Sequence, residues 1–227
     1  MRLLLFANGA APTQATVERW HRPGDLIVAA DGGTRHAIAA GLIPQHVIGD
    51  LDSLPPQVRA RLEAAGTRFH PHPPEKDETD LELALAWAAA QGAETIVVLG
   101  MWGGRPDQSV ANLLLLAMPV LRGRRVIAVA EGWSVRCLHS GERCHLHARP
   151  GTTLSLLPLG GAAQGVRTEG LRYPLHGETL HFGAARGVSN QFVAEEALVT
   201  LERGLLWLFQ APPPDEAPLD RRKETLR

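Results

Sequence analysis

The stretch from Thr95 to Gln108, TIVVLGMWGGRPDQ, decides the fold of the first half of the chain. A strand is expected over its first five residues, and Ile96–Leu99 form a continuous apolar run, which is typical of a strand buried on both faces of a parallel sheet. A glycine-rich loop follows, and a helical pattern begins near Asp107. A strand, a loop and a helix in this order predict the repeating unit of an α/β fold.

The same alternation extends outward from this stretch on both sides. Further strands are expected at four apolar runs, Leu3–Ala7, Leu26–Ala30, Val47–Ile48 and Arg125–Val129. Helices are expected over five longer segments, Thr13–Trp20, Thr34–Ala40, Pro56–Ala65, Thr79–Gln91 and Gln108–Met118. Because strands that alternate with helices form βαβ units, residues 1–130 are predicted to be an α/β domain with a mostly parallel sheet.

The pattern changes near Glu131, where the helical periodicity ends. Short β segments separated by glycine and proline follow, at Thr152–Leu157, Gly165–Arg167, Val188–Val193, Ala197–Leu201 and Leu205–Phe209. This spacing predicts an all-β, sandwich-like domain over residues 131–210. Residues 211–227 are rich in proline and charge and have little to bury, so we expect a mobile tail.

Composition and charge disfavour several classes of protein. The 227 residues carry a net charge of −1, from 23 basic and 24 acidic residues, which argues against a nucleic-acid partner. No apolar run approaches the ~20 residues of a membrane-spanning helix, so no membrane partner is expected. The two cysteines, Cys137 and Cys144, cannot form a disulfide framework, which favours a cytoplasmic protein.

Two acidic segments directly follow expected strands. Asp31 begins Asp31–Gly33, whose two glycines would let the backbone approach a ligand closely. Asp50 and Asp52 are two residues apart, so in an extended chain they project to the same side, and carboxylates at a strand end suit Mg²⁺. The alternatives are an ordinary strand-to-helix turn at the first segment and a capped loop at the second.

Two further polar segments precede expected helices. In Lys76–Asp80, the spacing of Asp77 and Asp80 could place both on one face of the first turn, although Asp77 could equally be a simple helix cap. In the next loop, Arg105 is the residue type preferred for phosphate oxygens, and Asp107 is another candidate cap. Carboxylates, a cation and backbone donors at one sheet edge together indicate a site for metal-bridged phosphates.

Other ligand motifs are missing or weak. The sequence has no Walker-type Gly-x-x-x-x-Gly-Lys-[Ser/Thr], and no Gly-x-Gly-x-x-Gly follows the first strand, which disfavours P-loop and nicotinamide-dinucleotide enzymes. The segment His70–Pro74 is expected to form a stiff loop rather than a ligand site. Zinc is disfavoured at four residues that lack its ligand spacing, Cys137, Cys144, His145 and His147.

Seven short motifs in a fixed order resemble the thiamine pyrophosphokinase family. Four lie in the first half, Asp31-Gly32-Gly33, Gly49-Asp50-Leu51-Asp52-Ser53, Lys76-Asp77-Glu78-Thr79-Asp80 and Gly103-Gly104-Arg105-Pro106-Asp107. Three lie in the second half, Gly151–Pro158, Val166–Leu171 and Gly187–Asn190. The resemblance covers nearly the whole chain up to residue 210. It implies an α/β domain that binds the nucleotide and a β-sandwich domain that binds thiamine.

The resemblance also implies an activity. This is the Mg²⁺-dependent transfer of the diphosphate of ATP to the hydroxyl of thiamine, which gives thiamine diphosphate and AMP. It further implies a homodimer with active sites between subunits.

The resemblance implies roles residue by residue. It assigns Mg²⁺ binding to Asp50, Asp52 and Asp80, and catalysis to these three together with Arg105. ATP would contact ten further residues, Asn8, Gly9, Asp31, Gly32, Gly33, Asp77, Thr79, Gly103, Gly104 and Asp107. Thiamine would contact Ser189, Asn190 and Phe192. Trp102 stands where the family has a smaller residue, so we expect it to pack over the nucleotide or to narrow the cleft.

Two alternative functions stay open at this point. One is a diphosphokinase of the same fold that acts on another alcohol, such as a hydroxymethylpterin. The other is a non-catalytic module that senses a nucleotide or thiamine. The intact set of three aspartates and Arg105 favours an enzyme, because a sensor has no need for metal-binding carboxylates.

Overall fold

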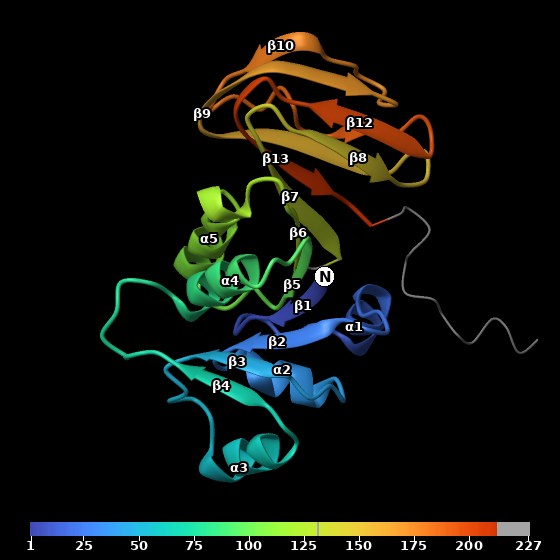
Figure 1. The fold of residues 1–227 in the computed structure, drawn as a ribbon. Coiled ribbons are helices and arrows are strands. Elements are labelled where there is room, and N and C mark those ends of the chain that lie inside the picture. The colour runs from blue at the N-terminus through green and yellow to red at the C-terminus, as the bar shows by residue number, and fades with distance from the viewer. Residues whose placement is uncertain (131, 213–227) are drawn as a thin grey trace, which may run out of the picture. The chain divides into compact units, whose positions relative to one another are not determined.

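The apolar run Thr95–Leu99 forms β5, a central strand in the computed structural model, which describes residues 1–130 and 132–212 (Figure 1). Four of its five residues are buried, as expected for a strand covered on both faces. It pairs in parallel with β1 (Arg2–Phe6) on one side and with β6 (Arg125–Ala130) on the other. The chain divides into two compact units, Met1–Cys137 and a second that begins at Leu138.

The sheet of the first unit has the order β4-β3-β2-β1-β5-β6-β7. Its other strands are β2 (Leu26–Ala30), β3 (His46–Gly49), β4 (Arg68–Pro71) and β7 (Trp133–His139). All neighbours pair in parallel except β6 and β7. The chain runs outward from β1 to β4 and then returns to β5, so the order reverses between β1 and β5. Open α/β sheets bind ligands at this switch point, outside the carboxyl ends of the strands.

Helices cover both faces of this sheet. They are α1 (Gln14–Trp20), α2 (Gly33–Ala39), α3 (Pro56–Ala64), α4 (Asp80–Ala90) and α5 (Pro106–Leu115), followed by a short 3₁₀ turn at Pro119–Leu121. Right-handed crossovers require helices on opposite faces once the strand order reverses. Figure 1 accordingly shows α4 and α5 on one side of the sheet and α1 and α2 on the other.

The second unit is built from antiparallel strands. They are β8 (Arg143–His147), β9 (Thr153–Glu169), β10 (His176–Leu180), β11 (Asn190–Gln191), β12 (Glu196–Thr200) and β13 (Arg203–Gln210). The long strand β9 pairs with β11 and β13 mainly through its first half and with β10 and β12 through its second half. Residues of these strands and of the segments beside them form one apolar core, which includes Leu156, Phe192 and Leu206.

The structure confirms the predicted fold class, a mostly parallel α/β part followed by an antiparallel β part. Some element predictions are wrong. Thr152–Leu157 and Gly165–Arg167 belong to a single strand, β9, and only Asn190–Gln191 of the segment Val188–Val193 is a strand. The stiff loop expected at His70–Pro74 begins later, because Arg68–Pro71 pairs with β3 as an edge strand, where proline is tolerated.

Two helix caps also differ from expectation. Thr79, and not Asp77, caps α4, because its hydroxyl accepts a hydrogen bond from the Glu82 N–H at 3.2 Å. Helix α5 starts at Pro106, so Asp107 lies in its first turn. Within the described residues, no helix is both long and apolar enough to cross a membrane. The tail expected from residue 211 falls almost wholly on 213–227, outside the described residues.

Candidate active site

The acidic segments meet where β2 and β3 end, and a glycine makes this close approach possible. Gly49, the last residue of β3, has a φ of +147°, a conformation that side chains rarely adopt. A Cβ atom at this position would lie 2.8 Å from the Asp31 Cβ and 3.0 Å from the Asp80 Cγ. Gly49 therefore lets the loop after β2 and the start of α4 approach the end of β3.

Asp31 is the buried member of the site. Its side chain is 6% exposed, and its Oδ2 accepts a hydrogen bond from the Ser53 hydroxyl at 2.6 Å. Its Oδ1 is buried and has no hydrogen-bond partner among the described residues. An unsatisfied buried carboxylate oxygen is costly unless a cation or another donor engages it. Asp31 also has a positive φ of 38°, a strained conformation of the kind that clusters at functional sites.

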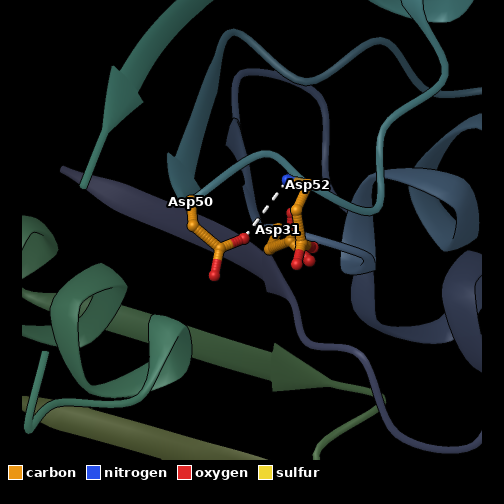
Figure 2. Close-up of side chains that lie close together, drawn as sticks. All are labelled: Asp31, Asp50 and Asp52. Carbon is orange, nitrogen blue, oxygen red and sulfur yellow. Dashed lines mark hydrogen bonds between the residues drawn. The ribbon is translucent and has the colours of Figure 1, made fainter. Parts of the chain in front are cut away.

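Asp31, Asp50 and Asp52 form a carboxylate cluster (Figure 2). Each offers one oxygen, and these oxygens lie within 4.8 Å of one another. Asp50 accepts a hydrogen bond from the backbone N–H of Asp52 at 3.2 Å, across a turn in which Leu51 has a φ of +64°. Three carboxylates with an unsatisfied buried oxygen among them fit a hard divalent cation such as Mg²⁺.

Asp80 lies beside this cluster and is joined to it by Lys76. The Lys76 Nζ is 3.0 Å from Asp80 Oδ1 and 3.5 Å from Asp50 Oδ2. Asp80 is the first residue of α4, where the helix dipole favours a negative charge. The structure therefore brings together Asp50, Asp52 and Asp80, and adds Asp31 as a close neighbour.

Proton affinities differ within the group. The backbone hydrogen bond from Asp52 lowers the pKa of Asp50, and the nearby Lys76 charge acts in the same direction. The Asp50 charge in turn raises the pKa of Asp52. Burial raises the pKa of Asp80 against the opposing effect of Lys76. Neighbouring carboxylates with separated proton affinities are typical of sites that handle both charge and protons.

A cleft opens at the switch point next to Asp80. It has a volume of about 150 Å³, and its lining includes Asn8, Gly9, Thr79, Gly103 and Gln108. The loops after β1 and β5 are fastened together there, because the Gly9 N–H donates to the Gly100 carbonyl at 2.6 Å.

Glycines keep the backbones close around this cleft. A Cβ on Gly9 would lie 2.5 Å from the Gly100 carbonyl oxygen, and one on Gly32 would lie 2.5 Å from the Asn8 side chain. A Cβ on Gly33 would lie 2.1 Å from the Phe6 carbonyl oxygen. The structure thus brings Asn8 close to Gly32 and places Gly9 beside Gly100.

Other predicted residues are exposed, border open space or line another pocket. The Arg105 side chain is 68% exposed, and its guanidinium pairs with Asp107 through bonds of 3.1 and 2.6 Å. Asp77 is exposed on the loop before α4. Gly104 has a φ of +77° and open space around it. Trp102 lines a separate pocket, together with Thr13 and Thr16.

In the second unit, the predicted thiamine contacts differ in accessibility. Ser189 is exposed and has a φ of +61°. The Asn190 side chain is buried and bonds the Tyr173 backbone twice, at 2.7 and 3.0 Å. Phe192 is 1% exposed and belongs to the apolar core, so it offers no free ring face in this structure. Tyr173, beside Asn190, is 60% exposed.

The sequence motifs contain Lys76 and Ser53, but they predict no contact of either side chain with the carboxylates; Ser53 is a candidate only for a helix cap. The structure shows that both contact the carboxylates directly. A signal for Lys76 was present, because it is one of only two lysines among 23 basic residues. The hydroxyl of Ser53 carried no such signal, because its contact depends on the turn after β3.

The fold and the site define a class of protein: an α/β unit with an acidic site at the carboxyl edge of its sheet, followed by an antiparallel β unit. The family described as thiamin pyrophosphokinase, catalytic domain, matches residues 18–128, and that described as thiamin pyrophosphokinase, vitamin B1 binding domain, matches residues 143–206. These two matches cover most of the chain. The protein belongs to the thiamine pyrophosphokinase family, whose named members are enzymes.

Individual relatives agree with this assignment. A thiamine pyrophosphokinase of Bacillus subtilis is 28% identical over 186 residues, which cover 82% of this chain and 87% of the relative. Thiamine pyrophosphokinase 1 of rice is 25% identical over 173 residues, covering 72% of this chain and 65% of the longer rice protein.

Solved structures share the fold. The crystal structure of a thiamin pyrophosphokinase family protein from Enterococcus faecalis has a TM-score of 0.77 at 27% identity, covering 93% of this chain and 99% of that one. The thiamine pyrophosphokinase from Bacillus subtilis has a TM-score of 0.81 at 24% identity, with the same coverage.

Proposed function

We propose that this protein transfers the diphosphate of ATP to the hydroxyl of thiamine, giving thiamine diphosphate and AMP. The observation that carries the proposal is the carboxylate cluster of Asp31, Asp50 and Asp52 at the sheet edge, in a chain of this family. Diphosphate transfer needs a site that gathers negative phosphate oxygens with a cation and then positions them.

We assign Mg²⁺ binding to Asp50, Asp52 and Asp80, with Asp31 as an additional oxygen donor. The unsatisfied Asp31 Oδ1 and the close spacing of the carboxylates support this donor set. When bound, Mg²⁺ would neutralise negative charge on the phosphate oxygens. Asn8, Gly9 and Gly32 would face the nucleotide at the switch point, where the backbones approach closely enough to position phosphates.

The proton of the thiamine hydroxyl needs an acceptor as the oxygen attacks the β-phosphorus. The new bond joins this oxygen to the β-phosphorus, and the bond from the β-phosphorus to the oxygen that leaves with AMP breaks. We assign the proton to the Asp52 oxygen that would not bind Mg²⁺, because this carboxylate is exposed. Arg105 would leave Asp107 and hold phosphate oxygens as charge builds on the leaving AMP.

In the second unit, we assign the direct thiamine contact to the exposed Ser189. Asn190 would hold this segment in place through its two bonds to the Tyr173 backbone. Phe192 would act as the buried anchor of the same segment rather than as a stacking partner. We also propose that the protein is a cytoplasmic homodimer with active sites between subunits. Analytical ultracentrifugation of the purified protein would test whether it is a dimer.

A product assay tests the proposed function. Purified protein is mixed with ATP, Mg²⁺ and thiamine, and the products are separated by chromatography. We expect AMP and thiamine diphosphate to appear in equal amounts. ADP with thiamine monophosphate would overturn diphosphate transfer. A product formed only with a hydroxymethylpterin would favour the pterin alternative, and binding without any product would favour a sensor.

A further inference from the structure

Lys76 is placed as a cation between two carboxylates of the candidate site. Its Nζ lies 3.0 Å from Asp80 and 3.5 Å from Asp50, and its side chain is only 12% exposed. A lysine ammonium group is charged at neutral pH, and here it occupies two carboxylates that we assign to Mg²⁺.

The choice of lysine at this position is unusual for this chain. Of its 23 basic residues, only Lys76 and Lys223 are lysines. Arginine binds a carboxylate through a planar fork with two parallel bonds, as Arg105 does with Asp107 here. Lysine is a compact charge on a flexible stem, so it can release a carboxylate and turn to another acceptor. Position 76 thus carries a cation that can change partners within a largely buried site.

The charges around Lys76 determine when it would leave the carboxylates. Four carboxylates, those of Asp31, Asp50, Asp52 and Asp80, surround the site, and Lys76 neutralises part of their charge. A divalent cation that enters alone must compete with Lys76 for Asp50 and Asp80. A cation that enters with a triphosphate brings phosphate oxygens, which can accept the displaced ammonium group.

We propose that Lys76 couples cation binding to triphosphate binding. Without ligand it holds Asp50 and Asp80 and weakens the binding of a bare divalent cation. When the metal–nucleotide complex binds, Lys76 moves from these carboxylates to the phosphate oxygens. The nucleotide half of this proposal rests on the proposed function, whereas the restraint on the bare cation does not.

Titration with Mn²⁺ alone tests the restraint. Free Mn²⁺ is followed by electron paramagnetic resonance in nucleotide-free protein. Lys76→Met, which removes the charge but keeps the length of the side chain, is expected to bind Mn²⁺ about 10-fold more tightly, within the usual range of coupling between sites. Lys76→Arg should bind it no more tightly than the unaltered protein. A merely structural role for Lys76 predicts weaker binding on its removal.

A matched control separates local from general charge effects. Arg59→Met removes a cation from an exposed pair with Glu63 on α3 and should leave Mn²⁺ binding unchanged. Thermal unfolding confirms that each variant is folded before titration. Unchanged or weaker Mn²⁺ binding by folded Lys76→Met, or an equal gain in Arg59→Met, would overturn the proposal.

Nuclear magnetic resonance of ¹³Cε-labelled lysine would follow the movement of Lys76 from the carboxylates to the phosphate oxygens. The two lysines of the chain should give two signals, which the Lys223→Arg variant would assign. We expect the Lys76 signal to shift strongly with Mg²⁺ and a non-hydrolysable ATP analogue together, and little with equimolar Mg²⁺ alone. A bound analogue that leaves the Lys76 signal unmoved would overturn the exchange. If the analogue does not bind, the proposed function fails, while the Mn²⁺ titration still decides whether Lys76 restrains the cation.

Discussion

The two sides of the switch point are held in different ways. Where β2 and β3 end, the carboxylates are fixed by the Ser53–Asp31 hydrogen bond, by Lys76 and by an approach that Gly49 permits. After β5, Arg105 is exposed and pairs within its own loop. We infer that the carboxylates themselves are preorganised, whereas the cations Lys76 and Arg105 must change partners to act. Preorganised groups need no rearrangement at the moment of reaction, which is why they contribute strongly to catalysis.

Asp52→Asn should have the largest effect of these substitutions, and it should reduce activity without reducing stability. Loss of this carboxylate is expected to lower turnover by about 10³-fold, the upper range for loss of one preorganised electrostatic group. Stability should be unchanged or slightly higher, because Asp52 is exposed and repels Asp50. Steady-state kinetics and thermal unfolding measure the two effects. Glu63→Gln, an exposed change on α3, serves as control, and a loss of stability that matches the loss of activity would refute this role.

Arg105→Ala tests the mobile side of the comparison. We expect kcat/KM for ATP to fall by about 10²-fold, the size typical of removing one charge-stabilising donor. The thermal midpoint should not move, because the exposed pair with Asp107 contributes little to stability. Arg59→Ala provides a matched exposed arginine on α3 and should keep full activity. Equal activity of the two variants would show that Arg105 does not join the reaction.

Gly49→Ala tests the packing of the preorganised side. The new Cβ would meet Asp31 and Asp80, so we expect a loss of about 1–3 kcal/mol in the free energy of unfolding, together with reduced activity. Gly41→Ala is the control, because Gly41 also has a positive φ, +75°, but has open space around it. Urea unfolding should show a smaller loss for Gly41→Ala. Similar losses in both variants would mean that glycine is needed at position 49 because of its backbone conformation and not because the aspartates approach it.

The smallest expected effect is a pH dependence of the free energy of unfolding, which arises where the edge strand β4 pairs with β3. His46 Nδ1 and His70 Nε2 are 2.9 Å apart, and both rings pack against Trp87. Burial lowers the pKa of both histidines, so the unfolded chain binds their protons more readily. Their contribution to stability is therefore complete above pH ~6.5 and is lost as the pH falls through their lower folded values.

Unfolding experiments between pH 5 and pH 7.5 check this pH dependence. Stability should fall on acidification, and His70→Asn should make the fall shallower. His21→Asn, on the segment after α1, changes a histidine outside this cluster and should leave the slope unchanged. A slope that is the same in the unaltered protein and in His70→Asn would contradict the linkage.

Local patterns in the sequence predict a large part of this molecule. The run Thr95–Leu99 and its loop indicate the parallel sheet, because burial on both faces leaves a continuous apolar pattern. The carboxylates follow from their places at strand ends. What local patterns do not predict are contacts between distant segments, such as Lys76 with Asp50 and Ser53 with Asp31.

The second unit shows the same limit. Two expected segments fuse into β9 because glycines such as Gly160, with a φ of +67°, let one strand continue through a bend between its two sets of partners. Phe192 follows an exposed serine by three residues, so its sequence position gives no sign that its ring is buried. Its place in the core depends on which strands surround it, and those strands come from across the unit.

Following the phosphorus atoms of ATP tests the central claim most directly. ATP labelled with ³²P at the α or the γ position is incubated with Mg²⁺, thiamine and either the unaltered protein or Asp52→Asn. We predict that the α label is recovered in AMP and the γ label in thiamine diphosphate, and that Asp52→Asn forms both about 10³-fold more slowly. Recovery of the α label in ADP, or equal rates for the two proteins, would contradict diphosphate transfer at the carboxylate cluster.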